Sequence, residues 1–84
     1  MKMTKDQFDR ACREFKKHAK ADKIEVTLYS GYFLIECSEV EMYRLAEAYN
    51  FDKKNNSWGY SENMKTHYFM FYLNYDGIYE DEGK

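Results

Sequence analysis

The stretch THYFMFYLNY at residues 66–75 decides how this chain can fold. Its pattern predicts a strand, and the side chains of a strand alternate between two faces. One face carries His67, Phe69, Phe71 and Leu73. The other carries Tyr68, Met70 and Tyr72. Only one of these faces can enter the core of a small sheet, and a solvated sheet face is ordinarily more polar than either. The stretch therefore predicts a core on one side and a binding surface on the other.

Length and composition indicate one globular domain spanning residues 1–84. Hydrophobic residues make up 44% and charged residues 33%, values typical of a folded chain. Aromatic residues reach 19%, with nine Tyr and six Phe. Proline is absent, so we expect Gly, Asn, Asp and Ser to form the turns. A chain this short supports a single modest core.

Residues 24–37 predict a β-hairpin whose two-residue turn is Ser30-Gly31. With that turn, three apolar pairs share the core face: Leu28 with Phe33, Val26 with Ile35, and Ile24 with Cys37. The opposite face pairs Tyr29 with Tyr32, Thr27 with Leu34, and Glu25 with Glu36. Turn length and hydrophobic pattern thus agree on one register.

Two capping boxes mark the starts of two helices. Thr4 with Gln7 precedes a helix expected from about Lys5 to Ala21. Ser38 with Glu41 precedes a helix expected to end near Tyr49. The apolar stripe of the first helix consists of Phe8, Ala11, Cys12, Phe15 and Ala19. The inward face of the second consists of Met42, Leu45, Ala46 and Tyr49, followed by Asn50 as a left-handed stop.

The remaining segments are assigned to short strands and turns. They are strands at Phe51–Lys53 and Ser57–Tyr60 around a turn at Lys54-Asn55-Asn56-Ser57, a loop at Ser61-Glu62-Asn63, a turn at Asp76-Gly77, and a frayed acidic tail at Glu80-Asp81-Glu82. The order α-β-β-α-β-β predicts an α+β fold with two layers, an antiparallel sheet with two helices on one face. We expect the core to contain Phe8, Phe15, Val26, Leu28, Phe33, Ile35, Phe69 and Phe71.

No pattern in the sequence indicates an enzyme, a metal site or a cofactor. Cys12 and Cys37 lie on core faces, where a thiol is inert. His18 and His67 are too few and too scattered for a metal site, and Glu14 gives His18 a helical partner. The four glycines are dispersed, so they form no phosphate-binding loop. We therefore expect a protein without catalytic activity.

Basic residues on the exposed side of the first helix form an alternative, nucleic-acid-binding site. They are Arg10, Arg13, Lys17 and Lys20. Such residues can neutralise phosphates, but Asp6 and Asp9 each stand four residues before an arginine and can pair with it. The net charge of −2 also disfavours a dedicated nucleic-acid-binding protein. An accessory role in nucleic acid binding is therefore the second hypothesis.

The outward sheet face is the first candidate site. Its members are Glu25, Tyr29, Tyr32, Glu36, Tyr68, Met70 and Tyr72. Tyrosines supply contact area with a hydrogen-bonding tip. The two glutamates repel phosphates and attract cations, which predicts a partner protein with a basic surface. The alternatives are that a second copy of the chain, in a homodimer, or the segment after Gly77 covers this face.

Composition leads to a more specific hypothesis about the biological role. The chain has no apolar run long enough to span a bilayer and no signal peptide, which predicts a cytoplasmic protein. A Lys-, Asn- and Tyr-rich chain of this length without proline is typical of small proteins of phages and mobile elements, many of which act stoichiometrically. The hypothesis is a non-enzymatic, anti-CRISPR-like inhibitor that occludes a basic surface of a host defence or nucleic-acid-processing complex.

Overall fold

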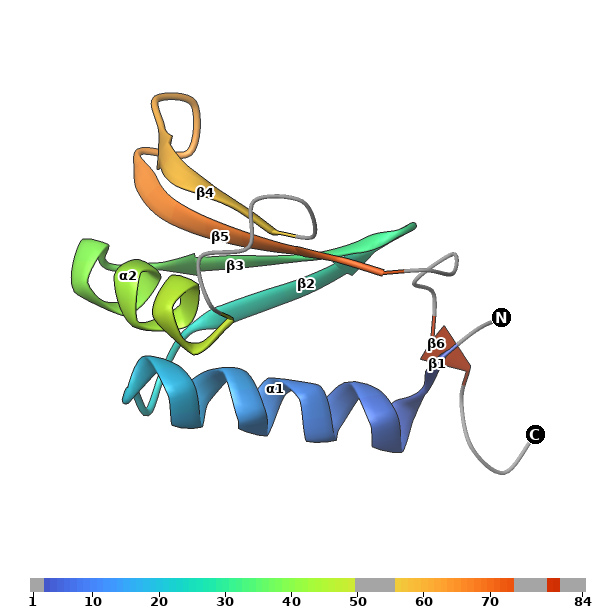
Figure 1. The fold of residues 1–84 in the computed structure, drawn as a ribbon. Coiled ribbons are helices and arrows are strands. Elements are labelled where there is room, and N and C mark those ends of the chain that lie inside the picture. The colour runs from blue at the N-terminus through green and yellow to red at the C-terminus, as the bar shows by residue number, and fades with distance from the viewer. Residues whose placement is uncertain (1–2, 50–55, 74–78, 81–84) are drawn as a thin grey trace.

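A computed structural model describes residues 3–49, 56–73 and 79–80. Its elements are β1 (Met3–Thr4), α1 (Lys5–Ala19), β2 (Glu25–Tyr29), β3 (Tyr32–Cys37), α2 (Glu39–Ala48), β4 (Asn56–Ser61), β5 (Thr66–Tyr72) and β6 (Tyr79–Glu80). Strands β2, β3, β5 and β4 form an antiparallel sheet in that spatial order. Both helices lie on one side of this sheet (Figure 1), which confirms the predicted α+β architecture.

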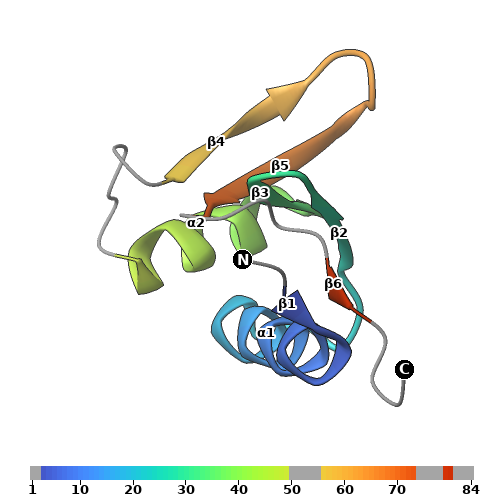
Figure 2. The same ribbon diagram turned by 90° about the vertical axis from the view of Figure 1, so that its right-hand side faces the viewer.

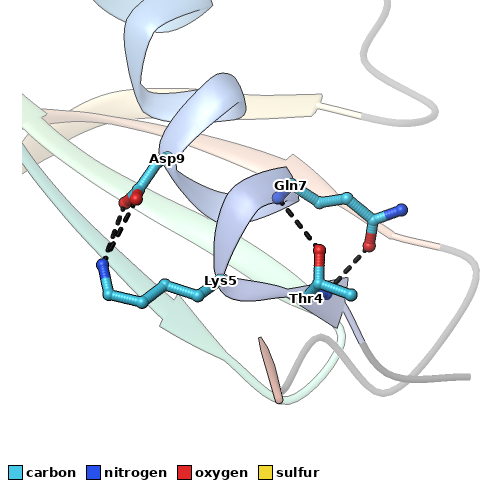
Figure 3. A network of polar contacts seen from close by, with 4 residues as sticks. All are labelled: Thr4, Lys5, Gln7 and Asp9. Carbon is cyan, nitrogen blue, oxygen red and sulfur yellow. Dashed lines mark hydrogen bonds and ion pairs between the residues drawn. The ribbon is translucent and has the colours of Figure 1, made fainter. Parts of the chain in front are cut away.

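Both helices begin at the predicted capping boxes. Thr4 Oγ1 accepts a hydrogen bond from the Gln7 N–H at 3.1 Å, and Gln7 Oε1 accepts one from the Thr4 N–H at 2.8 Å (Figure 3). Ser38 and Glu41 form the same reciprocal pair at the start of α2. Helix α1 ends at Ala19 rather than at Ala21, because Lys20 adopts the left-handed conformation with a φ of 55° and caps the helix.

The β2–β3 hairpin has the predicted register. Leu28 lies opposite Phe33, and Val26 lies opposite Ile35. Gly31, the second turn residue, has a φ of 88°, a conformation that glycine adopts without steric cost. The third expected pair, Ile24 with Cys37, lies just beyond the ladder, which ends at Glu25 and Glu36, although Cys37 is buried in the core and Ile24 packs against it.

The segment before the aromatic strand differs from the prediction. The strand expected at Ser57–Tyr60 is confirmed as part of β4, but Asn56, which we expected in a turn, is the first residue of that strand and pairs with β5. Ser61 ends β4, so the connecting turn spans residues 62–65 rather than 61–63. Cross-strand pairing with β5 outweighs the turn propensity of Asn and Ser. The expected features at Asn50, Phe51–Lys53 and Asp76-Gly77 lie outside the described residues.

Glu80 belongs to a strand rather than to a frayed tail. Tyr79–Glu80 forms β6, which pairs in parallel with β1. This two-stranded pair lies beside the start of α1, on the helix side of the larger sheet (Figures 1 and 2). One alternative for the outward sheet face was that the segment after Gly77 covers it. Tyr79–Glu80, the described part of that segment, does not lie on that face.

The core lies between the helices and the inner sheet face. Its buried hydrophobic residues are Met3, Phe15, Ala19, Phe33, Ile35, Cys37, Met42, Leu45, Ala46 and Phe69. Four of the eight expected core residues are among them, and the other four, Phe8, Val26, Leu28 and Phe71, are half-buried and pack against the core. Arg44 of α2 links the two helices, because its Nη1 donates to the carbonyl oxygen of Ala19 at 3.2 Å.

Candidate protein-binding surface

The outward face of the four-stranded sheet consists of three rows of residues that run across the strands. The first row contains Tyr29, Tyr32 and Tyr72. The second contains Thr27, Leu34, Met70 and Ser57. The third contains Glu25, Glu36, Tyr68 and Gly59. We call this surface the outer face. It holds all seven residues of the predicted partner-binding site, and neither α1 nor α2 covers it (Figure 1).

The first row is a continuous line of aromatic rings. Tyr29 stacks on Tyr32 with a centroid distance of 5.2 Å, and Tyr32 lies 6.3 Å from Tyr72 in a tilted arrangement. Tyr29 and Tyr72 at the ends of the row remain 44% and 41% exposed. The rings support one another, so each has little freedom to lose when a partner binds.

A hollow of about 320 Å³ lies beside this row on the outer face. It is lined by Tyr32, Leu34, Ser61, Met64, Tyr68 and Met70. The β4–β5 hairpin curves away from the rest of the sheet (Figure 1), so Ser61 and Met64 at its end form one wall of the hollow. A lining of aromatic and thioether side chains suits an apolar side chain of a partner.

Met64 and Ser61 were missed in the sequence, because their position depends on the shape of the 62–65 turn. Ser61 holds this turn together: its Oγ accepts from the Met64 N–H at 3.2 Å, and its carbonyl oxygen accepts from the Lys65 N–H at 2.7 Å. Lys65 has a φ of 56°, which completes the turn. The sequence did contain one signal for this site, namely a hydrophobic residue, Met64, within a polar turn. Met64 is 38% exposed in the structure.

The outer face carries an uncompensated pair of negative charges. Glu25 and Glu36 lie directly opposite each other on β2 and β3. Neither forms an ion pair with another residue that the structure describes. Like charges at directly opposite positions destabilise a strand pair. A cationic side chain placed between these carboxylates would relieve that repulsion.

The basic residues of the alternative site lie on the opposite side of the molecule. Arg10, Arg13 and Lys17 are exposed on α1, whereas Lys20 follows the last helical residue as its cap. Asp9, the expected partner of Arg13, pairs instead with Lys5 at 3.2 Å (Figure 3). Lys5 and Arg13 each stand four positions from Asp9 along the helix, so the two cations compete for one carboxylate. Arg13 therefore has more freedom to bind an external anion than the sequence predicted.

The structure also brings together Cys37, His67 and Glu39, which the sequence does not connect. His67 lies opposite Cys37 on adjacent strands, and its Nε2 is 3.6 Å from Glu39 Oε2. Burial, reinforced by the Glu41 carboxylate, raises the pKa of the Cys37 thiol to about 12. A thiol that stays protonated at neutral pH is a poor nucleophile. The arrangement therefore favours a packing role for Cys37.

No group of three or more His, Cys, Asp and Glu side chains in ranges 3–49, 56–73 and 79–80 could hold a metal ion. Neither described helix has the length and apolar character needed to cross a membrane.

Comparison of the chain with protein-family models, curated proteins and solved structures gives no match. No relative therefore supplies a function for the outer face.

Proposed function

We propose that the chain is a non-enzymatic protein-binding module whose outer face docks on a basic surface of another protein. The observation that supports the proposal is the outer face itself, where a row of three tyrosines borders a hollow and two unneutralised glutamates lie in the third row of the same face. Tyrosine and methionine are enriched at the centres of protein interfaces. The hollow gives such an interface a place for an apolar anchor from the partner.

The charge of the partner follows from Glu25 and Glu36. Their mutual repulsion in the free protein makes a lysine or arginine of the partner favourable between them. Charges at such a position act chiefly on association rate and on the choice of partner. The partner is thus a protein whose surface presents a basic residue next to an apolar one.

Within this proposal the specific role is stoichiometric inhibition, of the phage or mobile-element type and anti-CRISPR-like. Carboxylates and phosphates are bound by the same arginine and lysine side chains. An acidic, aromatic face can therefore compete with a nucleic acid for the basic groove of a host complex. No transformation of the bound partner is involved, so the role requires neither a catalytic group nor a cofactor.

The test is capture from the heparin-binding fraction of a bacterial lysate, which is enriched in proteins with basic surfaces. The variant Tyr68→Ala with Tyr72→Ala removes two outer-face rings. The matched control is Tyr43→Ala with Tyr60→Ala, because these tyrosines are 52% and 51% exposed but lie away from the outer face. We expect the outer-face variant to reduce capture of a specific protein at least tenfold and the control to leave it unchanged.

Two further arms examine the chemistry of the captured complex. Glu25→Lys with Glu36→Lys should slow association, and an excess of a DNA oligonucleotide should displace the captured protein. Equal capture by the wild type and the Tyr68/Tyr72 variant, both folded, would show that the outer face is not the functional surface. Capture that is insensitive to DNA would contradict the inhibitory role but leave the binding role intact.

A second candidate function, nucleic acid binding through α1, is favoured by one observation. Asp9 is engaged by Lys5, which leaves Arg13 without an ion pair among the described residues. Fluorescence anisotropy with a labelled DNA duplex tests it. We expect binding to be weak at about 150 mM salt, because few phosphate contacts are available. Micromolar binding that Arg13→Glu abolishes would establish the second function instead.

A further inference from the structure

Strand β2 is an edge of the sheet, and within the described chain it pairs with β3 alone. The two-residue turn makes Tyr29 and Tyr32 a hydrogen-bonded pair, so the backbone groups of Tyr29 point toward β3. The direction of the backbone N–H and C=O groups alternates from one residue of the strand to the next. The N–H and C=O groups of Val26 and Leu28 therefore point away from the sheet. Residues Glu25–Tyr29 contain no proline, lysine or bulge, which are three of the usual protections of an edge, and their one charged residue is Glu25 at the start of the strand.

We propose that β2 pairs in antiparallel fashion with β2 of a second copy, about a two-fold axis between the two Thr27 residues. In this register Val26 lies opposite the partner's Leu28, and the symmetric pair forms on the other side of the axis. Each pair exchanges two backbone hydrogen bonds through the groups that point away from the sheet. The contact thus satisfies, in both copies, edge donors and acceptors that have no backbone partner within residues 3–49, 56–73 and 79–80.

The side chains of β2 are complementary in the same register. On the inner face, half-buried Val26 meets the partner's Leu28, so apolar area is removed from water. On the outer face, Glu25 lies opposite the partner's Tyr29, and Thr27 lies opposite the partner's Thr27. All five residues of the strand are paired, and Glu25 stays away from the partner's Glu25, which would repel it.

The inference is independent of the proposed function, but it would alter how that function works. A two-fold axis perpendicular to the sheet keeps both outer faces on the same side. The dimer would present one continuous sheet of twice the width and two binding surfaces side by side, so a partner with repeated basic sites gains avidity. Five residues from each copy make a small interface, and we expect a dissociation constant in the micromolar range.

The test is sedimentation equilibrium of the full chain over a wide concentration range. Thr27→Lys places two like charges against each other at the two-fold axis, while in the monomer it lies on an exposed position beside Glu25. Ser57→Lys is the matched control, because Ser57 occupies the same row at the opposite edge of the sheet. We expect Thr27→Lys to weaken dimerisation at least tenfold and Ser57→Lys to leave it unchanged. Mixing Thr27→Lys with Thr27→Glu should restore a heterodimer.

Hydrogen exchange of the wild-type chain gives a second readout that needs no variant. The amide protons of Val26 and Leu28 should exchange more slowly as concentration rises, whereas those of Thr27 and Tyr29 should be protected at every concentration. A wild type that stays monomeric at high concentration would overturn the proposal. So would a dimer that Ser57→Lys dissociates, which would indicate association through β4 or through the outer face.

Discussion

The Tyr68 side chain lies over Gly59 of the neighbouring strand, so closely that a β-carbon on residue 59 would stand 3.3 Å from Tyr68 Oη. The two residues are direct partners in the β4–β5 ladder. A glycine at this position weakens the strand intrinsically, because it has no side chain to pack. Its presence leaves the space in which the Tyr68 ring rests on the sheet and forms part of the hollow.

Gly59→Ala should therefore move Tyr68 and leave the fold intact. The added methyl group displaces the ring by a few tenths of an ångström, while the loss of glycine entropy in the unfolded chain offsets the cost, so the free energy of unfolding should change by less than about 1 kcal/mol. Ring proton shifts of Tyr68 would report the displacement. Gly31→Ala is the control: its β-carbon meets nothing within 4 Å, but its φ of 88° should make the substitution cost about 1–2 kcal/mol without moving Tyr68. A larger loss of stability in Gly59→Ala than in Gly31→Ala, or a Tyr68 ring that moves only in Gly31→Ala, would contradict this account of Gly59.

The expected core residues should differ in their contribution to stability according to burial. Phe69 is fully buried and contacts Trp58 and Tyr49, whereas Phe8 is half-buried and stacks on Phe33 at the edge of the core. Phe69→Ala should cost about 3–5 kcal/mol in the free energy of unfolding, and Phe8→Ala clearly less. Urea denaturation of both variants checks the order. Equal losses would mean that Phe8 is as deeply packed in solution as Phe69.

Arg44 should stabilise the packing of the two helices. Its guanidinium donates to the last carbonyl of α1, a group that has no partner within the helix, and its charge is favourable at a helix C-terminus. Arg44→Met keeps most of the aliphatic contact and should cost about 1 kcal/mol. Arg13→Met, which removes an arginine without a described ion pair, should leave the unfolding free energy nearly unchanged.

Stability should fall in alkaline solution because of Cys37. Burial raises the pKa of this thiol to about 12, from an ordinary value of 9.0 in the unfolded chain. Between these two values the unfolded chain has lost the proton and the folded chain has kept it, so the contribution to stability is complete below pH 9 and declines as the pH rises. Tyr49, whose pKa burial raises to about 12 from 10.0, adds to the decline at higher pH. Urea denaturation from pH 7 to 10.5 should show a slope above pH 9 that Cys37→Ala reduces. An unchanged slope would mean that the thiol is accessible in the folded protein.

Local signals in the sequence were sufficient for the helix starts and for the first hairpin. Each capping box places its two partners three residues apart, so the hydrogen bonds follow from the sequence alone. The hairpin register followed because the two-residue turn and the apolar alternation required the same pairs. Strand alternation alone places Tyr68 and Tyr72 on the face opposite Phe69, so this assignment did not depend on which strands lie beside β5.

Features that depend on distant partners were not predictable in the same way. Asn56 has the propensity of a turn residue, yet it lies buried in β4 because β5 offers it a place in the ladder. The proximity of Cys37, His67 and Glu39 depends on how β5 aligns with β3, which no local pattern specifies. Asp9 had two possible cationic neighbours at equal spacing, and only the side-chain conformations decide that Lys5 binds it.

The pairing of β1 with β6 has a consequence for the order in which the chain folds. The hairpins β2–β3 and β4–β5 close short loops, whereas β1 and β6 join positions near the two ends of the sequence. Closing so long a loop is entropically costly, and only two residues of each strand pair in return. Contacts of this kind form after the local ones and are the first to open. Helix α1 follows β1 directly, so we expect its first turn to reach its final position beneath the sheet late in folding.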